Sequence, residues 1–482
     1  MLTQEHIPLV ATADIASVYS NVVSAKERYA RIVQAFTEKF GEAPQFICRS
    51  PGRVNLIGEH IDYSGFSVCP MAIERDMVIA VGTKEAAFST IANSDPKYKA
   101  REFITGPGIE IDATIHEWSN YFLCGYKGLA DKLKLDSMKP MQVMCDGAVP
   151  AGGGLSSSSA FVCCSAIATH QANNGNLSKG GLTEAAINGE QFAGVQIGGM
   201  DQSISIMAHS GSALLIDFYP SLAANPVVIP QASRAVFVIA NTLVVADKHM
   251  TAPTNYNLRV VEIRMAAALI WKRLTGKSPL KIVTLRETQD LIANETAKTA
   301  LDCLDVLLKV TDEVFKTEKY QLCEIAEALD MTQEEIFDMF IGSMIIRSDG
   351  FSLYSRTKHV YQEAQRVLRF RDTCLENPNS DVSVQLGNLM NESHLSCKEL
   401  FECSCPELDE LRQIALSAGA LGSRLTGAGW GGCTVSIVKE DNLEHFIQTV
   451  KEKYYAVKFP NNHSLNDAIF SSRPCLGAAI WY

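Results

Sequence analysis

One short polar stretch gathers side chains that can bind and activate a hydroxyl substrate. Arg53, Glu59, His60 and Asp62 supply a guanidinium, two carboxylates and an imidazole within ten residues. Carboxylates accept paired O–H bonds and a guanidinium can steady a transferring phosphoryl group, so this set could hold several hydroxyls of a sugar at once. An ion-pair cluster at the end of a strand would have the same composition, and the string alone does not decide between the two.

A second stretch, Pro150–Ala160, combines glycines with serines. Three consecutive glycines leave the main chain open, so several backbone N–H groups can approach one anion, and the serines follow where a helix would begin. Phosphate is the expected ligand, although the loop lacks the Gly-Lys-Ser/Thr of a Walker A motif. A flexible linker is the alternative, but the apolar helical run Ala160–Ala168 follows at once.

Two further glycine-rich strings interrupt the apolar pattern, at 198–203 and 424–433. Asp201 lies in the first of them, after two glycines. It could cap a helix, or it could serve as the base or the orienting carboxylate for a hydroxyl nucleophile. Because unpaired polar groups are costly to bury, a chain with four such interruptions is expected to build a site from them.

The surrounding pattern predicts the elements that must position these strings. A capping box at Ser24–Glu27 should start a helix that ends at Gly41. Four strands are expected at 46–49, 54–57, 67–73 and 77–81, with breaks at Pro51-Gly52, Tyr63–Gly65 and Glu74–Asp76. Strand 141–147 then leads into the glycine loop and a helix that extends to about Gln171.

The order of elements predicts an α+β chain with two domains, at 1–230 and 231–482. A helix at 182–191 and a strand at 211–218 would complete the first domain. The second would open with strand 235–240, continue as helices from 257 to 415 with interruptions near 276–279 and 377–380, and end in a final strand at 433–438.

Composition excludes several classes of function. With 482 residues and a net charge of −11, the chain has no basic excess for binding nucleic acid or an anionic membrane. There is no apolar run long enough to span a bilayer and no signal-like start, so we expect a cytosolic protein. We also expect a monomer, without a specific signal for it in the sequence. Cys397, Cys403 and Cys405 lie near His394, but no second close pair gives them zinc-finger spacing.

Together the strings resemble those of the GHMP small-molecule kinases, and within them the galactokinase family. Ser50–Tyr63 is similar to the galactokinase signature, Gly152–Ala160 to the phosphate loop and Gly427–Cys433 to the third motif, in the order of the family. Segments at 121–125, 198–205, 358–361 and 402–408 look closest to the eukaryotic N-acetylgalactosamine kinases. The resemblance implies the two-domain GHMP kinase fold, with the active site in the cleft between the domains.

The resemblance also implies an activity, which is transfer of the γ-phosphoryl group of ATP to the C1 hydroxyl of N-acetylgalactosamine or galactose. Asp201 would be the catalytic carboxylate, as proton acceptor or electrostatic orienter, with Arg53 as its cationic partner. The implied sugar-binding residues are Arg53, Glu59, His60, Asp62, Gly199, Asp201 and Tyr256. The implied nucleotide-binding residues are Trp118, Asn120, Tyr121, Gly152, Gly153, Gly154, Leu155, Ser156, Ser157, Ser158 and Lys248. Ser158 and Glu190 would hold Mg²⁺.

The sugar itself stays open at this stage. The loop Gly194–Met200 is similar in part to ordinary galactokinases and in part to N-acetylgalactosamine kinases, and Tyr256 stands where the former have tyrosine. We expect N-acetylgalactosamine, with a galactokinase proper as the alternative. Other kinases of the superfamily fit the string Gly58–Tyr63 less well. A catalytically silent sugar sensor that regulates a partner protein is the alternative from another class.

Overall fold

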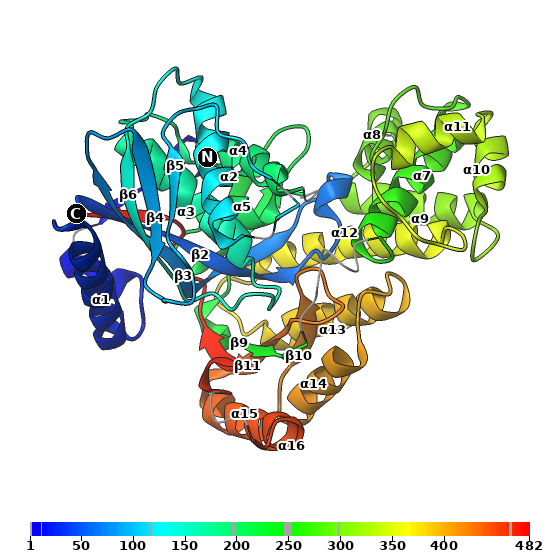
Figure 1. Cartoon of the computed structure of the whole chain (residues 1–482). Coiled ribbons are helices and arrows are strands. Elements are labelled where there is room, and N and C mark those ends of the chain that lie inside the picture. Colours follow the sequence, from blue (N-terminus) through cyan, green and yellow to red (C-terminus); the bar gives the residue numbers. More distant parts are fainter. Residues whose placement is uncertain are drawn as a thin grey trace.

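The chain folds into three parts that meet near its centre. The structure is a computed structural model that describes residues 2–10, 12–112, 114–115, 117–194, 198–244, 253–296, 298–461 and 465–482. Figure 1 shows a first part with a large sheet and its helices, a helical part to its right, and a lower part with a smaller sheet. The long helix α12 (Leu353–Glu376) runs from the helical part towards the centre.

The large sheet has seven strands in the order β1-β13-β2-β3-β6-β4-β5. Its strands are β1 (Leu9–Val10), β2 (Phe46–Ile57), β3 (Cys69–Thr83), β4 (Phe88–Asn93), β5 (Arg101–Ile104), β6 (Met141–Gly147) and β13 (Ala479–Trp481). A separate antiparallel pair, β7 (Ser212–Asp217) and β8 (Ala223–Val228), lies beside it. Strands β6 and β7 lie where the sequence predicted strands.

Two of the predicted breaks are wrong, because β2 and β3 each run on as one long strand. At Pro51, which has no N–H to donate, the ladder steps from the pair Pro51–Asp76 to the pair Arg53–Ala72. Four residues of β3 therefore span what two cover in β2, and the polar string forms a bulge instead of a turn. Asp76 stays buried there because ion pairs with Arg28 and Arg49, both at 2.5 Å, compensate its charge.

Helices cover both faces of this sheet. On one face lies α1 (Val22–Phe40), whose Tyr29, Ile32 and Phe36 pack with Ile47 and Trp481. On the other lie α2 (Trp118–Leu133), α3 (Ser157–Ala172), α4 (Lys179–Glu190) and α5 (Met200–Met207). The predicted capping box at Ser24 is wrong. Asn21 caps α1 by accepting from the Ser24 backbone, while Gly41, in the left-handed region, ends the helix as predicted.

The prediction of helices between 257 and 415 is confirmed. These helices form the helical part and continue into the lower part. The helices are α7 (Tyr256–Thr275), α8 (Leu285–Thr296), α9 (Ala300–Val314), α10 (Leu322–Leu329), α11 (Gln333–Ile336), α12, α13 (Ser383–Glu399) and α14 (Pro406–Ser417). Helix α7 ends at Thr275 and helix α12 ends at Glu376, where Gly276 and the Asn-Pro string interrupt the helical pattern as predicted. No helix in the described ranges is both long enough and apolar enough to cross a membrane.

The lower part contains a four-stranded sheet in the order β10-β11-β9-β12. Its strands are β9 (Ala235–Asn241), β10 (Gly422–Thr426), β11 (Cys433–Lys439) and β12 (Ile469–Ser472), flanked by α15 (Leu443–Val450) and α16 (Ala456–Lys458). The prediction that the chain ends in a strand at 433–438 is wrong, since β12 and β13 follow it.

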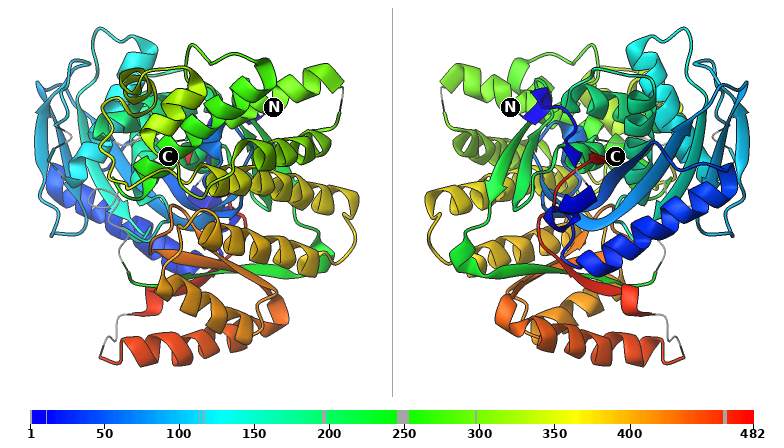
Figure 2. Two further views of the ribbon diagram at one scale, coloured as in Figure 1. Left: turned by 90° about the vertical axis from the view of Figure 1, so that its right-hand side faces the viewer. Right: turned by 90° about the vertical axis from the view of Figure 1, so that its left-hand side faces the viewer.

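The end of the chain returns to the first part. Strand β13 pairs antiparallel with β2 and parallel with β1, so Trp481 lies opposite Ile47. Figure 2 shows the red C-terminal segment rising from the lower part to the blue strands. The predicted boundary near residue 230 stays a prediction, but the last strand belongs to the sheet of the first half.

Candidate active site

The sugar-binding residues expected from the sequence line one cavity of about 380 Å³. Its wall also includes segments from the helical part and the third glycine motif. The seven expected residues on this wall are Arg53, Glu59, His60, Asp62, Gly199, Asp201 and Tyr256. Residues as far apart in sequence as Arg53 and Tyr256 therefore meet at one concave surface, which is the usual form of a small-molecule site.

Arg53 joins the expected catalytic carboxylate to the glycine loop. Its Nε donates to Oδ1 of Asp201 at 2.7 Å, and its Nη1 donates to the carbonyl oxygen of Gly154 at 2.6 Å. The Arg53 side chain is only 3% exposed, while that of Asp201 is 20% exposed. The ion pair thus holds Asp201 in place and leaves part of its carboxylate open to the cavity.

Glycines bring Asp201 and Asp62 together. Gly199, with φ of 102°, precedes α5 and places Asp201 in its first turn. A Cβ at Gly198 would lie 1.9 Å from Asp62 Oδ2, so any other residue there would displace the Asp62 carboxylate. Burial, and next the charge of Asp201, raise the pKa of Asp62 to about 6.

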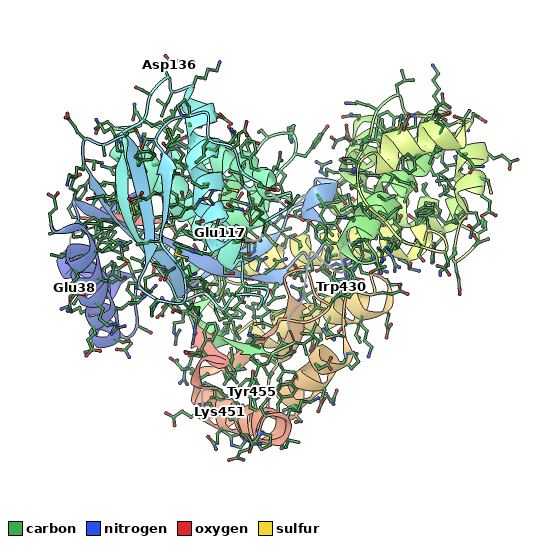
Figure 3. All side chains as sticks on the ribbon, in the orientation of Figure 1. Glu38, Glu117, Asp136, Trp430, Lys451 and Tyr455 are labelled. Carbon is green, nitrogen blue, oxygen red and sulfur yellow. The ribbon has the colours of Figure 1, made fainter. Side chains whose placement is uncertain are left out.

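His60 links the sugar signature to the third glycine motif. Its Nε2 lies 2.9 Å from the carbonyl oxygen of Ala428, which can only accept, so Nε2 carries a proton. The imidazole stacks on Phe401 with a centroid distance of 4.6 Å and meets Trp430 edge-on. Trp430 lies where the three parts of the molecule meet (Figure 3).

A buried arginine, which had no signal in the sequence, binds the Glu59 carboxylate from the side of the second sheet. Arg424, which is fully buried in β10, donates from Nη2 to Glu59 Oε2 at 3.0 Å and from Nη1 to the carbonyl oxygen of Asn55. Burial raises the pKa of Glu59 to about 7, against the effect of Arg424 and Arg53. The buried carboxyl of Glu59 is therefore fixed in place by contacts from the second sheet.

The glycine loop and the third glycine motif touch backbone to backbone. A Cβ on Gly427 would lie 2.5 Å from the oxygen of Gly154, and one on Gly432 would lie 2.9 Å from the oxygen of Gly153. On the other side, Leu155 accepts a backbone bond from Arg53. The loop is thus clamped between the two other motifs. The residues of this loop that are expected to bind the nucleotide lie between β6 and the first turn of α3: Gly152, Gly153, Gly154, Leu155, Ser156, Ser157 and Ser158.

Three expected nucleotide residues lie at the start of α2. Trp118 stacks on Phe161 of α3 with parallel rings, and Tyr121 is partly buried nearby. The Asn120 carboxamide donates to two backbone oxygens of the loop before the helix and accepts from Arg101, so the protein itself occupies both of its ends. Glu117 marks this helix start in Figure 3. Lys248, the remaining residue of this set, lies outside the described residues.

Glu190, at the end of α4, presents oxygen ligands of the kind that Mg²⁺ prefers. Its carboxylate is buried, accepts from Ser159 at 3.0 Å and also accepts from Gln202. Burial raises the pKa of Glu190, and a contact with Ser158 opposes this. In the described ranges no three His, Cys, Asp or Glu side chains cluster as metal ligands. A single carboxylate with hydroxyls fits Mg²⁺, which takes its other ligands from phosphates and water.

Part of the cavity wall had no signal in the sequence. Ser343, Met344 and Ile345 line it from the loop after the helical turn Phe337–Ile341, and Asn257 of α7 donates to the Ile345 carbonyl oxygen at 3.3 Å. These residues lie in an ordinary helix-and-loop pattern with no glycine string or charge cluster. Only the folded chain places them beside the sugar signature.

Comparisons with known proteins agree with this architecture. The chain matches the galactokinase galactose-binding signature over residues 34–83, the GHMP kinase N-terminal domain over 120–209 and the GHMP kinase C-terminal model over 383–456. The galactokinase of Dictyostelium discoideum is 40% identical, covering 96% of each chain. That of Saccharomyces cerevisiae is 39% identical, covering 94% of this chain and 95% of its own.

Solved structures show the same fold. The Lactococcus lactis galactokinase complexed with galactose superposes with a TM-score of 0.71 at 23% identity, covering 94% of this chain and 99% of its own. The mevalonate kinase of Methanococcus jannaschii gives a TM-score of 0.53 at 16% identity, covering 89% of this chain and 98% of its own.

The fold and the cavity define a GHMP small-molecule kinase, with the two-domain α+β architecture expected from the sequence. Within that superfamily the chain belongs to the galactokinase family and is a sugar kinase. The expected closer relation to N-acetylgalactosamine kinases is not supported. The relatives named above are galactokinases, so the comparisons favour the galactose alternative.

Proposed function

We propose that this protein transfers the γ-phosphoryl group of ATP to the C1 hydroxyl of galactose and produces the α-1-phosphate. The observation that carries the proposal is the Arg53–Asp201 ion pair of 2.7 Å at the wall of a cavity that also bears Glu59, His60 and Asp62. Galactose is preferred over N-acetylgalactosamine because relatives about 40% identical over nearly the whole chain carry the name galactokinase.

In this mechanism the chain mainly positions groups and neutralises charge. Asp201 accepts the C1 proton or holds the hydroxyl in line, while Arg53 fixes Asp201 and faces the transferring group. Asp62 and His60 bind the other hydroxyls of the sugar. Residues Gly152–Ser158 surround the phosphates, with Trp118, Asn120, Tyr121 and Lys248 on the nucleotide side.

Glu190 and Ser158 would hold Mg²⁺, which neutralises phosphate charge when it is bound with ATP. The buried carboxylate of Glu190 is kept in position by Ser159 and Gln202, so it can serve as a fixed oxygen ligand. We further expect the enzyme to act as a monomer in the cytosol, with a sugar and ATP as its only partners and neither nucleic acid nor membrane.

The test is the specificity constant kcat/KM for galactose and for N-acetylgalactosamine, measured side by side with Mg-ATP on wild type and on Asp201→Asn. We expect galactose to be preferred and the variant to lose activity with both sugars. A preference for the acetamido sugar would overturn the substrate assignment. Saturable sugar binding without any turnover would overturn the kinase assignment and favour a sensor.

A further inference from the structure

A second, smaller pocket of about 180 Å³ lies directly behind the sugar cavity. Tyr63 and Tyr256 line both spaces and so form the partition between them. The other walls come from Ser64 at the end of the 3₁₀ turn Asp62–Ser64, from one face of α7 and from the loop before α8. The residues of α7 and of the loop are Val260, Ile263, Arg264, Ile282, Val283 and Thr284. The volume is far larger than the roughly 30 Å³ share of one liquid water.

Two donors at this pocket have no partner in the described part of the chain. Arg264 makes no hydrogen bond or ion pair, and burial lowers the pKa of its guanidinium. The Ser64 side chain is 1% exposed, and its hydroxyl is buried without a hydrogen-bond partner. Unpaired buried polar groups are rare in folded proteins, so the buried Ser64 hydroxyl beside the partly buried, unpaired Arg264 guanidinium indicates a site for an acceptor.

Charge at the pocket favours an anion. Its walls carry one cation and, among the described residues, no acidic side chain. Glu287, which borders the wall, already accepts from the Thr284 backbone at 2.7 Å and from its hydroxyl at 3.1 Å. A guanidinium presents a planar fork of donors that suits phosphate or carboxylate oxygens, and a nearby hydroxyl adds one more bond.

We propose that this pocket binds a small oxyanion of the phosphate class between Arg264 and Ser64. Such an anion would tie α7 to the short 3₁₀ turn Asp62–Ser64 of the sugar signature. The partition between the pockets is already connected to the sugar site, because Tyr63 lies 3.2 Å from His60 Nδ1 and Tyr256 contacts both rings. Occupancy of the pocket therefore tightens sugar binding by fixing this wall.

The direct test is titration of the full chain with inorganic phosphate by calorimetry, in the presence of saturating Mg-ADP and galactose so that the glycine loop and the sugar cavity are filled. We expect one binding event, weakened tenfold or more in Arg264→Gln and severalfold in Ser64→Ala. Arg273→Gln is the matched control on the same helix, since its ion pair with Glu313 is exposed to solvent. It should bind phosphate like wild type.

Two further arms complete the test. Arg264→Lys keeps the positive charge but loses the planar set of donors, so its phosphate affinity should lie between those of wild type and Arg264→Gln. This variant still tests the site if Arg264→Gln folds poorly. A hexose 1-phosphate in place of inorganic phosphate distinguishes free phosphate from a phosphorylated sugar as the source of the anion. Absence of phosphate binding to wild type, or equal binding by Arg264→Gln, would overturn the site. Equal galactose affinity with and without phosphate would overturn the coupling. None of these measurements requires turnover, so they stand apart from the proposed kinase activity.

Discussion

Arg53 reaches Asp201 with Nε and Gly154 with Nη1, so a single guanidinium spans the expected catalytic carboxylate and the phosphate loop. Replacing Asp201 by asparagine removes a charged contact to the reacting hydroxyl. We expect kcat to fall by a hundredfold or more, corresponding to about 3 kcal/mol, with a smaller change in the KM for ATP. Steady-state kinetics with both substrates varied would measure this.

Arg53→Lys tests the same relationship from the other side. Lysine keeps the charge, but as a point donor it cannot bond Asp201 and Gly154 in two fixed directions, so most of the loss in kcat should remain. The double variant Arg53→Lys/Asp201→Asn should lose little more activity than either single variant, because both substitutions break the same ion pair. Fully additive losses would contradict the linked arrangement.

Asp62 should contribute to the acid limb of the pH profile, together with Glu59, whose pKa burial raises to about 7. The pKa of Asp62 is raised to about 6 by burial and by Asp201, so Asp62 becomes protonated, and stops accepting from two hydroxyls at once, as the pH falls through 6. We expect kcat/KM for the sugar to fall in that range. Asp62→Asn should have a lower but flatter profile, whereas Asp136→Asn, in an exposed loop (Figure 3), should keep the wild-type shape.

Glu363 should contribute stability that is lost in acid. Burial would raise its pKa, but Arg366 and further partners lower it to about 2 from an ordinary value near 4.5. A carboxyl with a depressed pKa stabilises the fold fully above about pH 4.5, and this contribution of about 3 kcal/mol disappears as the pH falls towards 2. Denaturant unfolding at stepped pH should show a smaller acid loss for Glu363→Gln than for wild type. Glu392→Gln, at an exposed position of α13, should behave like wild type.

Gly427 should be needed for the contact between the third motif and the phosphate loop. Alanine there would meet the Gly154 oxygen at 2.5 Å and push the loop away, so the KM for ATP should rise about tenfold or more. Gly276 is the matched control, because its φ of 72° is close to the 84° of Gly427 but nothing lies near its Cβ position. Gly276→Ala should cost only about 1 kcal/mol of stability and leave the KM for ATP unchanged.

Glu190→Gln should raise the Mg²⁺ concentration needed for half-maximal activity. The amide oxygen is a weaker ligand than the carboxylate, while its shape and the contacts with Ser159 and Gln202 are largely kept. Glu184→Gln, on the same helix but in an exposed pair with Lys132, should leave the Mg²⁺ requirement unchanged. The same requirement in both variants would remove Glu190 from the metal site.

The sequence predicted the parts of the site that glycine and charge mark. The signature, the glycine loop and Asp201 stand out because their residue types interrupt the apolar pattern. In the folded chain they meet at Arg53, which bonds to both Asp201 and Gly154. Arg424, Met344 and Ile345 could not be found this way, since a lone arginine in a strand and apolar residues in a loop are ordinary. Strand breaks were overpredicted at Pro51 and Glu74 because a long bulged strand tolerates local breakers when ion pairs such as Arg49–Asp76 compensate for buried charge.

The pairing of β13 with β2 has a consequence for synthesis in the cell. Strand β2 is complete after residue 57, but its outer neighbour appears only with residues 479–481. At translation rates of about 5–20 residues per second, the edge of β2 waits roughly 20 to 85 seconds for its partner. The nascent chain thus carries an open strand edge while residues 58–478 are made, and an unpaired edge is the kind of surface that can pair with another chain. The first half cannot complete its sheet until residues 479–481 have left the ribosome.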